Sequence, residues 1–411
     1  MSQIEELIQQ YCPDGVDWVR LVDVCDKVCS GGTPSRAKGD YFTGNIPWLR
    51  TQEVDWKDVQ DTEIKITEEA VKNSSAKIIP KNCVIVAMYG ATAGKVCINK
   101  IPLTTNQACC NLQINPQKAH YRYVYYCVCN EYENIKSLGQ GSQNNINAQI
   151  VKDYLIPLPP LPVQEEIAKI LDSFTELQAE LQAELQARRQ QYQYYRDKLL
   201  SFEGRDDVEW KKLGDCINSL YTGLNPRRFF KLNTDDAKNF YVTIREIHNN
   251  TIVINEKTDR INDEALKLCN NRSHLEKGDV LFSGTGTIGE VAVLEETPQN
   301  WNIKEGVYSI KPISNILNYR FLMYLFQSTK IKQSYLKKAA GGTVKSVPMN
   351  EMRNLLIPVP PLSVQEEIVA TLDKFNTLVN DLSQGLPAEI EARKRQYEYY
   401  RDKLLTFKKK A

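Results

Sequence analysis

Residues 156–167 read IPLPPLPVQEEI, and residues 357–368 read IPVPPLSVQEEI. A second matching pair follows, ARRQQYQYYRDKLLSF at 187–202 and ARKRQYEYYRDKLLTF at 392–407. Matching stretches that recur in the same order indicate an internal duplication, which determines the architecture before any local pattern is considered. The chain therefore contains two copies of one unit.

Each copy ends in a helical pattern. Apolar and aromatic residues, with Arg188 and Arg393 taking one place each, recur at intervals of three and four from residue 174 to 202, and again from 375 to 407. This spacing predicts a long amphipathic helix in each copy, whose narrow apolar stripe is typical of a coiled coil. A stripe of this width needs a partner, and we expect the two helices to pair with each other. The residues predicted to pair are Leu177, Leu181, Leu185, Tyr192, Tyr195, Leu199, Leu382, Ile390, Tyr397, Tyr400 and Leu404.

The first helix contains a short repeat, LQAELQAELQA at 177–187. Each four-residue unit adds about 6 Å of helix. The matching landmarks begin at residues 156 and 187 in the first copy and at 357 and 392 in the second, so the second interval is four residues longer. The second helix also contains Gly385 and Pro387, which predict that it breaks and restarts near residues 384–388.

A globular segment precedes each helix. Strand–turn–strand patterns occur at 83–98 (CVIVAMYGATAGKVCI) and at 279–293 (DVLFSGTGTIGEVAV), mixed with helical runs such as YRYVYYCVCNEYENI. This mixture predicts an α+β fold, with two globules alternating with two long helices around a pseudo-twofold axis. The predicted boundaries are an N-terminal helical segment at 1–15, a first globule at 16–156, a central helix at 157–205, a second globule at 206–357 and a C-terminal helix at 358–411.

Composition places the chain among ordinary soluble proteins. Its 411 residues suffice for two or three domains, and 42% hydrophobic and 25% charged residues are typical of globular chains. No apolar run reaches the length of a membrane span and the N-terminus is polar, so we expect a cytoplasmic protein without a membrane partner. Eleven cysteines, three histidines and no CxxC pairs predict buried thiols and no metal site.

The sequence offers little for catalysis. Gly284, Gly286 and Gly289 match the spacing of a cofactor-binding turn, but a strand pattern follows where such a turn needs a helix, so a hairpin turn is predicted. The chain has no GxxxxGK[ST] phosphate loop and no acid or amide before Pro-Pro-aromatic, which adenine methyltransferases use to hold a flipped base. We therefore predict no catalytic residue and no cofactor in this chain.

Binding of nucleic acid is better supported. Both globules carry a modest excess of basic over acidic residues, which is compatible with phosphate contacts. Polar loops recur at corresponding places of the two copies, and Arg, Asn and Gln side chains can read base edges in the major groove. The candidate DNA-binding residues are Ser35, Arg36, Lys38, Tyr89, Thr92, Gln140, Ser142, Gln143 and Asn144 in the first globule, and Asn225, Arg227, Arg228, Thr285, Thr287, Thr343 and Lys345 in the second.

The two hinges, the two YYRDKLL helices and the opening Cys12-Pro13-Asp14-Gly15-Val16 together resemble the specificity subunits of type I restriction–modification systems, over essentially the whole chain. The LQAE repeat is similar to that of a branch whose repeat number relates to the length of the unread DNA spacer.

The resemblance implies two target-recognition domains that each read one half of a split double-stranded DNA sequence, held apart by two helices paired as an antiparallel coiled coil. It implies that the helices dock methyltransferase subunits, two in number, and that further subunits translocate and cut DNA. S-adenosylmethionine, ATP and Mg²⁺ would then belong to those partner subunits, not to this chain.

Two other hypotheses stay open at this point. The chain could be a self-contained DNA methyltransferase or nuclease with an unrecognised active site, in which case the purified chain alone would methylate or cut DNA. It could also be a coiled-coil scaffold that binds protein and no DNA. Salt-dependent, sequence-selective DNA binding that requires methyltransferase subunits would separate the specificity subunit from both.

Overall fold

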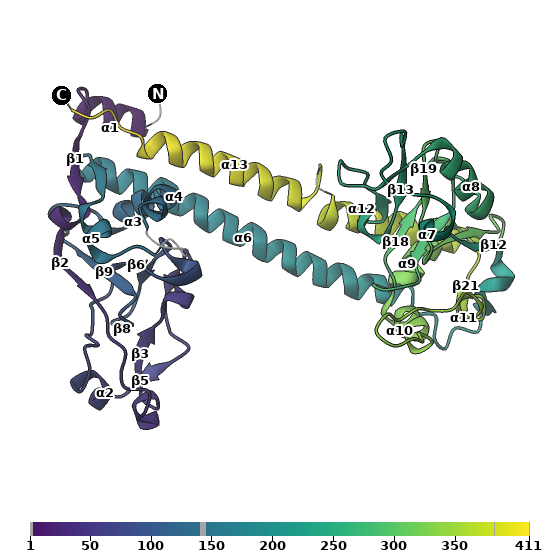
Figure 1. Ribbon diagram of the computed structural model, residues 1–411, viewed down its shortest axis with the longest axis horizontal. Helices are drawn as coiled ribbons and strands as arrows, with labels where there is room; N and C mark the ends of the chain where they lie inside the picture. The colour runs from purple at the N-terminus through teal and green to yellow at the C-terminus, as the bar shows by residue number, and fades with distance from the viewer. Residues whose placement is uncertain (1–2, 140–144, 382, 411) are drawn as a thin grey trace. The chain divides into compact units, whose positions relative to one another are not determined.

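The computed structural model describes residues 3–139, 145–381 and 383–410 (Figure 1). The chain divides into two compact units. The first unit contains the residues up to Glu180 together with those from Glu391 onward, and the second contains Leu181–Ile390. Within the described ranges, no helix is both long and apolar enough to cross a membrane.

The first half of the chain supplies the globular part of the first unit. Its helices are α1 (Gln3–Tyr11), α2 (Glu68–Lys72), α3 (Tyr121–Asn130), α4 (Tyr132–Ser137) and α5 (Ala148–Asp153). Its strands are β1 (Asp17–Arg20), β2 (Cys25–Ser30), β3 (Ile46–Leu49), β4 (Asp58–Val59), β5 (Lys65–Ile66), β6 (Val84–Ala87), β7 (Val96–Asn99), β8 (Thr104–Thr105), β9 (Cys109–Ile114) and β10 (Leu155–Leu158).

The second half supplies the globular part of the second unit. Its helices are α7 (Pro226–Phe229), α8 (Asp263–Ser273), α9 (Tyr319–Gln327), α10 (Thr329–Lys337) and α11 (Met349–Arg353). Its strands are β11 (Glu209–Lys212), β12 (Ile217–Thr222), β13 (Asn239–Val242), β14 (Ile247–His248), β15 (Thr251–Ile252), β16 (Arg260–Ile261), β17 (Val280–Ser283), β18 (Val291–Val293), β19 (Trp301–Ile303), β20 (Val307–Pro312) and β21 (Leu356–Val359).

The two globular parts share one topology. The first has a five-stranded sheet in the order β2-β9-β6-β7-β4, and the second has a four-stranded sheet in the order β12-β20-β17-β18. A three-stranded sheet accompanies each of them, β5-β3-β8 and β16-β13-β19, with one antiparallel and one parallel pair. The α+β class and the internal repeat are therefore confirmed.

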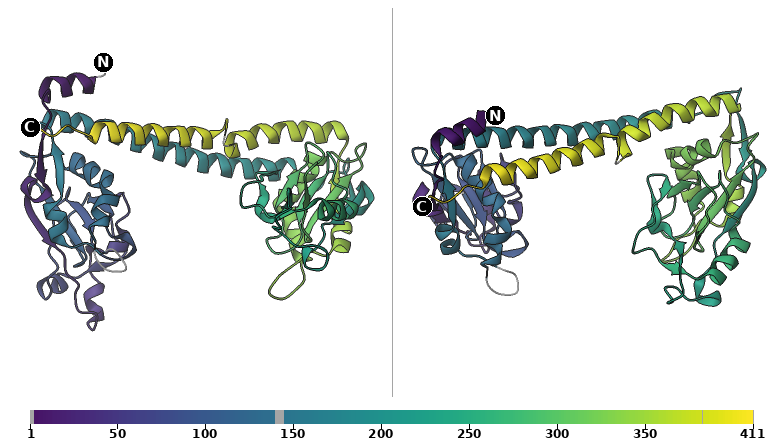
Figure 2. Two further views of the ribbon diagram at one scale, coloured as in Figure 1. Left: turned by 45° about the horizontal axis from the view of Figure 1, so that its top comes forward. Right: turned by 90° about the horizontal axis from the view of Figure 1, so that it is seen from above.

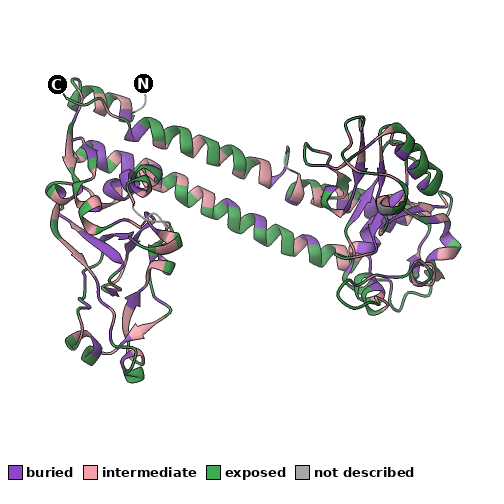
Figure 3. Ribbon diagram, in the orientation of Figure 1, coloured by how far each residue is buried: buried purple, intermediate pink, exposed green. Residues whose placement is uncertain are grey.

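Burial explains why the central strands form. Every residue of β6 (VIVA) and of β17 (VLFS) is buried, as expected for strands that are covered on both faces. Figure 3 shows buried residues concentrated in the sheets of both units, while the long helices are largely exposed. Helices α3 and α9 pack beside these sheets and bury almost all of their apolar residues.

A short antiparallel strand pair closes each globular part at its hinge. Strand β1 pairs with β10, with Trp18 opposite Pro157, and β11 pairs with β21, with Trp210 opposite Pro358. Proline donates no backbone hydrogen bond and is tolerated in such two-stranded edges. Each hinge thus brings the start and the end of a globule together immediately before its long helix.

Three helices carry the matching segments: α6 (Leu161–Leu199), α12 (Leu362–Asn380) and α13 (Leu386–Leu405). Figure 2 shows α6 as one continuous helix and the interruption between α12 and α13. The predicted break of the second helix is confirmed and begins slightly earlier, after Asn380. Asp381 caps the break by accepting hydrogen bonds from the backbone N–H groups of Ser383 (2.7 Å) and Gln384 (3.2 Å). A side chain at Gly385 would lie 2.3 Å from the Thr377 carbonyl oxygen, so only glycine fits there.

Aromatic contacts show how the helices pair. In the first unit, Phe174 of α6 stacks on Tyr400 of α13 with ring centroids 5.5 Å apart. In the second unit, Tyr195 of α6 stacks on Phe375 of α12 at 5.8 Å. Residue numbers rise along α6 while those of its partners fall, so the pairing is antiparallel.

The other predicted pairing residues lie at several places along the helices. Leu181, Leu185, Tyr192 and Leu404 are buried, Leu177, Leu199, Ile390 and Tyr397 are half-buried, Tyr195 and Tyr400 are partly exposed, and Leu382 lies outside the described residues.

The glycine-rich turn at 284–289 joins two antiparallel neighbours, β17 and β18. Gly286 (φ +81°) and Gly289 (φ +100°) adopt the left-handed backbone that a tight turn requires. A strand follows the turn where a cofactor-binding loop would need a helix. The predicted hairpin is confirmed.

Candidate nucleic-acid interface

Backbone hydrogen bonds join two polar loops of the second globular part. Thr285 of the β17–β18 turn forms a β-bridge with Ser346, and Gly286 N–H donates to the Lys345 carbonyl oxygen at 3.0 Å. The Val347 N–H donates to the Gly284 carbonyl oxygen at 2.9 Å. The predicted residues of the turn therefore lie next to the loop that carries the predicted Thr343 and Lys345, both of which are exposed.

A cleft of about 1070 Å³ gathers part of the predicted set in the second unit. Asn225, Thr285 and Thr287 line it, and Val344 lies at its edge between the predicted Thr343 and Lys345. The cleft is thus built from three chain segments that are far apart in the sequence but were predicted together.

Hydrogen bonds orient the polar groups of this cleft. The Asn225 side-chain amide donates to the Glu305 carboxylate at 2.6 Å. The predicted Arg228 is exposed on α7, and the side chain of Arg227 lies outside what the structure describes. The cleft therefore presents both donors and acceptors, as needed for reading base edges.

Sequence reasoning missed two cations of the cleft, Arg245 and Lys304. The Arg245 guanidinium donates to the Asp259 carboxylate at 2.7 Å, but more than half of the arginine side chain is exposed, so this ion pair is weak and can yield to a phosphate. The sequence did contain a signal for the position of Arg245. The segments LRTQEV at 49–54 and VTIREI at 242–247 share their apolar spacing and a glutamate, which indicates that they are equivalent turns of the two copies.

That glutamate forms the same short turn in both copies. Glu53 accepts from the Arg50 N–H at 3.1 Å, and Glu246 accepts from the Thr243 N–H at 2.8 Å. The turn is structural, whereas the residue before the glutamate differs: Gln52 in the first copy and Arg245 in the second. Equal scaffolds thus carry different polar side chains.

The first globular part brings fewer of its predicted residues together. Ser35, Arg36 and Lys38 lie exposed on the loop after β2, and the Lys38 ammonium donates to the Tyr41 hydroxyl at 3.0 Å, which raises the pKa of Lys38. Tyr89 is exposed on the β6–β7 turn. Among the described residues, no hydrogen bond joins that loop to this turn.

The β6–β7 turn is fixed by neighbouring segments. The Thr92 hydroxyl donates to the Thr51 carbonyl oxygen at 2.9 Å, and the Gly90 N–H donates to the Asn145 side chain at 3.1 Å. The predicted Gln140, Ser142, Gln143 and Asn144 lie outside the described residues. Asn145, which directly follows them, lies at the turn that carries Tyr89.

The same polar cluster attaches each globular part to its own long helix. Arg122 and Tyr126 of α3 both donate to the Asp172 carboxylate of α6, the latter at 2.5 Å. Arg320 and Tyr324 of α9 donate to Asp373 of α12 at 2.7 and 2.6 Å. We call these two clusters the anchors: Arg122, Tyr126 and Asp172 in the first unit, and Arg320, Tyr324 and Asp373 in the second.

Burial and hydrogen bonding shift the pKa values of the anchor residues. It raises the pKa of the Tyr324 hydroxyl, and the hydrogen bond to Asp373 raises it further, so this hydroxyl stays protonated and donates. For Arg122, burial lowers the pKa, but the ion pairs with Asp172 and Asp58 outweigh that effect and the net shift is upward. In each anchor the arginine therefore stays charged and the tyrosine stays neutral at the contact between helix and globule.

A buried glutamine accompanies each anchor. The Gln164 carbonyl accepts from the His120 N–H at 2.8 Å, and that of Gln365 accepts from the Asn318 N–H at 2.8 Å. Both glutamines are fully buried. They satisfy the first backbone donors of α3 and α9, which would otherwise be unpaired.

The described residues contain no group of three or more His, Cys, Asp and Glu side chains that could hold a metal ion. All eleven cysteines are free, and most are buried. Burial raises the pKa of thiols such as Cys83 and Cys110 to about 12, which makes them poor nucleophiles and poor metal ligands at neutral pH.

Known proteins resemble this chain along most of its length. A family model described as "Type I restriction modification DNA specificity domain" matches residues 13–188 and 205–392, one match for each copy. The EcoR124I/EcoR124II specificity subunit of Escherichia coli is 33% identical over 302 residues, which cover 71% of this chain and 72% of that protein.

Solved structures share the fold at low sequence identity. One chain, from work on complex assembly and conformational transition of the type I R-M system, is 18% identical with a TM-score of 0.67 and covers 96% of this chain and 98% of its own. The S subunit of the type I restriction–modification system of M. genitalium is 16% identical with a TM-score of 0.56, covering 95% and 96%.

Proposed function

We propose that this chain, which belongs to the type I restriction modification DNA specificity domain family, reads a split double-stranded DNA target, with one globular domain for each half-site. The observation that carries the proposal is the contrast between scaffold and loops. The two domains share sheet order, hinge pairing and anchor, yet present different side chains at corresponding places such as Gln52 and Arg245. A repeated frame with different polar loops is suited to reading two different sequences.

The long helices would dock the methyltransferase subunits. Tyr194 of α6 and Tyr399 of α13 are 61% and 62% exposed, although rings of this size are usually covered in a soluble protein. Each packs edge-on against its neighbour, Tyr195 or Tyr400, at 5.3 and 5.4 Å, which fixes its direction. Exposed, oriented tyrosines are typical anchors of protein interfaces. Their occurrence in both copies supports two equivalent docking surfaces and hence two methyltransferase subunits.

In this assembly the chain is a recognition subunit without catalysis of its own. The methyltransferase subunits would bind S-adenosylmethionine and methylate adenine, and restriction subunits would use ATP and Mg²⁺ to translocate and cut unmodified DNA. The assembly would act in the cytoplasm, where the DNA is. The sequence supports this division of labour, because it carries neither the phosphate loop nor the adenine-gripping motif that those reactions use.

Mapping methylated adenines in the host genome tests the proposal. Deletion of the gene should abolish one two-part methylation motif, and the unaltered gene should restore it. A gene carrying Asn225→Ala should restore a motif that is relaxed only in the half read by the second domain, since a lost bidentate contact costs about 1–3 kcal/mol of discrimination. Lys337→Gln, an exposed change on α10 away from the cleft, is the matched control. Retention of the full methylation pattern after deletion would refute the proposal.

A further inference from the structure

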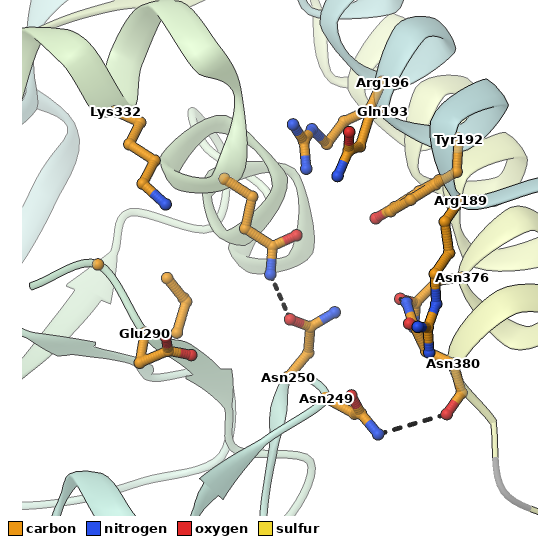
Figure 4. Close-up of a pocket in the computed structure, with 13 residues that line it drawn as sticks. Arg189, Tyr192, Gln193, Arg196, Asn249, Asn250, Glu290, Lys332, Asn376 and Asn380 are labelled. Atoms are coloured by element: carbon orange, nitrogen blue, oxygen red, sulfur yellow. Dashed lines mark hydrogen bonds between the residues drawn. The ribbon is translucent and has the colours of Figure 1, made fainter. Parts of the chain in front are cut away.

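The second unit contains a cavity of about 310 Å³ between α6, α12 and the globular part, away from the cleft described above (Figure 4). Three cationic side chains line it: Arg189 and Arg196 of α6, and Lys332 of α10. Glu290 is the one carboxylate among the described lining residues, so the lining carries a net charge of about two positive units. The remaining lining is mostly amide side chains, which rules out an apolar ligand.

The cations of this cavity are available to a ligand. Among the described residues, none forms a hydrogen bond or an ion pair with the Arg189 guanidinium or the Lys332 ammonium group. Arg196 donates to the Asp197 carboxylate through Nε and Nη2, at 3.2 and 3.1 Å, which leaves its Nη1 group for another acceptor. Asp197 is itself engaged elsewhere, because it also accepts from the Thr329 N–H at 3.1 Å.

A buried hydroxyl also points into this space. Tyr192 is only 6% exposed, and its hydroxyl has no hydrogen-bond partner among the described residues. Figure 4 shows the hydroxyl directed into the cavity, while the Arg189 side chain extends toward Asn376 and Asn380. Burial raises the pKa of Tyr192 to about 12, so the group is protonated at neutral pH and can donate. A buried, unpaired hydroxyl is costly, and an acceptor in the cavity would satisfy it.

The other copy has an aromatic ring at one position that corresponds to the cavity lining. Trp56 and Asn249 each lie three residues after the matching short turn, and both adopt left-handed backbone, at φ 58° and 46°. The Trp56 ring packs edge-on against Tyr132 at 5.0 Å and joins the core of the first unit. In the second unit Asn249 lines the cavity instead. The fold therefore does not require a polar side chain at this position, and the second copy has one there.

From these observations we propose that the cavity is a phosphate-binding site, which takes a phosphate group through Arg189, Lys332 and the Tyr192 hydroxyl. The net positive lining selects an anion. The donors lie on different sides of the cavity, with Lys332 opposite Tyr192 and Arg189 in Figure 4, and a tetrahedral phosphate with its ordered water offers more acceptor oxygens to such a set than a carboxylate does. The volume leaves room for bound water or for part of an ester beside the phosphate.

Calorimetric titration of the full chain with inorganic phosphate, in a low-salt chloride buffer, tests the site. We expect saturable binding at one site. Lys332→Gln and Arg189→Gln should each weaken binding by about tenfold or more, because each removes a charge-assisted hydrogen bond. Lys337→Gln on the same helix α10 should bind phosphate like the unaltered chain. Absence of saturable binding, or unchanged binding by both cavity variants, would overturn the proposal.

Tyr192→Phe gives a second readout that does not depend on charge. It removes only the unpaired hydroxyl, so the phosphate-free protein should be as stable as the unaltered chain or more so, while phosphate affinity falls about fivefold or more. A merely structural tyrosine would show the reverse pattern, with lower stability and unchanged affinity. That result would count against the site.

The phosphate could come from a free phosphate compound or from the DNA backbone, and DNA binding by the chain together with its partner subunits separates these sources. If the backbone supplies it, inorganic phosphate competes with DNA, and Lys332→Gln lowers the slope of log affinity against log salt by about 0.9. If a free compound supplies it, DNA affinity and its salt dependence are unchanged in Lys332→Gln. The phosphate titration itself needs no DNA, so its outcome is independent of the function proposed above.

Discussion

His120 and Asn318 occupy the same position in the two copies, and only one of them caps its helix. The Asn318 side chain accepts hydrogen bonds from the Arg320 and Phe321 N–H groups at 2.9 and 3.1 Å, whereas the His120 side chain makes no capping bond. The backbones are nearly the same, with φ, ψ of −82°, 123° at His120 and −70°, 129° at Asn318. His120→Asn should therefore adopt the cap already present in the second copy.

The expected gain can be worked out from these contacts. A new asparagine cap contributes about 1 kcal/mol, and removal of the buried, unpaired His120 Nδ1 adds to it. Loss of the ring contact with Tyr121, at 5.1 Å, offsets about 0.5 kcal/mol. We expect a net stabilisation of α3 of about 1 kcal/mol at pH 8, equivalent to a roughly fivefold smaller equilibrium constant for opening.

The advantage of the variant should grow in acid. Burial lowers the pKa of His120 below its ordinary value of 6.5, against the opposing effect of Glu165 and Asp172. As the pH falls below 6.5, the unfolded state takes up a proton that the folded state does not, so the unaltered protein loses stability. Asparagine does not titrate, and at pH 5.5 the difference should increase by up to about 1.4 kcal/mol.

Hydrogen exchange of α3 peptides, followed by mass spectrometry, measures this effect. Variant and unaltered protein are compared at the same pH, which cancels the intrinsic dependence of exchange on pH, and α9 peptides serve as the internal reference. Asn318→His is the reciprocal control, which should weaken α9 and make it pH-sensitive. The reasoning is refuted if His120→Asn leaves α3 protection unchanged at pH 8, or if its advantage does not grow between pH 8 and pH 5.5.

Three further predictions concern the anchors, the repeat and the docking surfaces. Asp373→Ala leaves Arg320 without its helix partner and should lower α9 protection by about 2 kcal/mol in hydrogen exchange, with α3 unchanged; equal protection would contradict the role of the anchor. Insertion of one LQAE unit after Glu184 lengthens α6 by about 6 Å and should lengthen the unread DNA spacer by one or two base pairs, with both half-sites kept; sequencing of methylated sites would reveal an unchanged spacer if the idea is wrong. Tyr194→Ala and Tyr399→Ala should each weaken the docking of one methyltransferase subunit by about 2 kcal/mol without unfolding the chain, and co-purification of both subunits with the double variant at normal yield would exclude this surface.

The repeat and the helices could be predicted because their signals are local. The matching hinges, the three–four spacing and the pair Gly385 and Pro387 each act within a few residues, and the structure has the corresponding elements. The exact start of the helix break could not be predicted, because it depends on the Asp381 side chain folding back on Ser383 and Gln384.

Features that depend on residues far apart in the sequence could not be predicted. The sheet order β2-β9-β6-β7-β4 pairs strands that are far apart in the sequence, and several strands have only two residues. The ion pair between Arg122 and Asp172 spans 50 residues. Its sequence signal was the arginine followed four residues later by a tyrosine, which HYRYVYY and NYRFLMY share and which becomes meaningful once the aspartates on the helices are known.

The candidate site was predicted in part. Loop chemistry identified Asn225, Thr285 and Thr287, which line one cleft of the second domain. Arg245 was missed because composition gives no sign of exposure in a short turn between strands, and only the matching spacing of LRTQEV and VTIREI indicates that turn. The base-reading roles of all these residues remain predictions. The loops differ between the two copies, so a role in one copy cannot be transferred to the other.

The anchors also bear on how recognition can change. A globule that carries either pair, Arg122 with Tyr126 or Arg320 with Tyr324, meets an aspartate at the same helical position, Asp172 or Asp373. We therefore expect the attachment to be interchangeable, because it involves none of the loops proposed to read DNA. Recombination between the matching hinge sequences would replace a whole domain with one that already contacts the aspartate on its long helix. A new target specificity could then arise in a single recombination event.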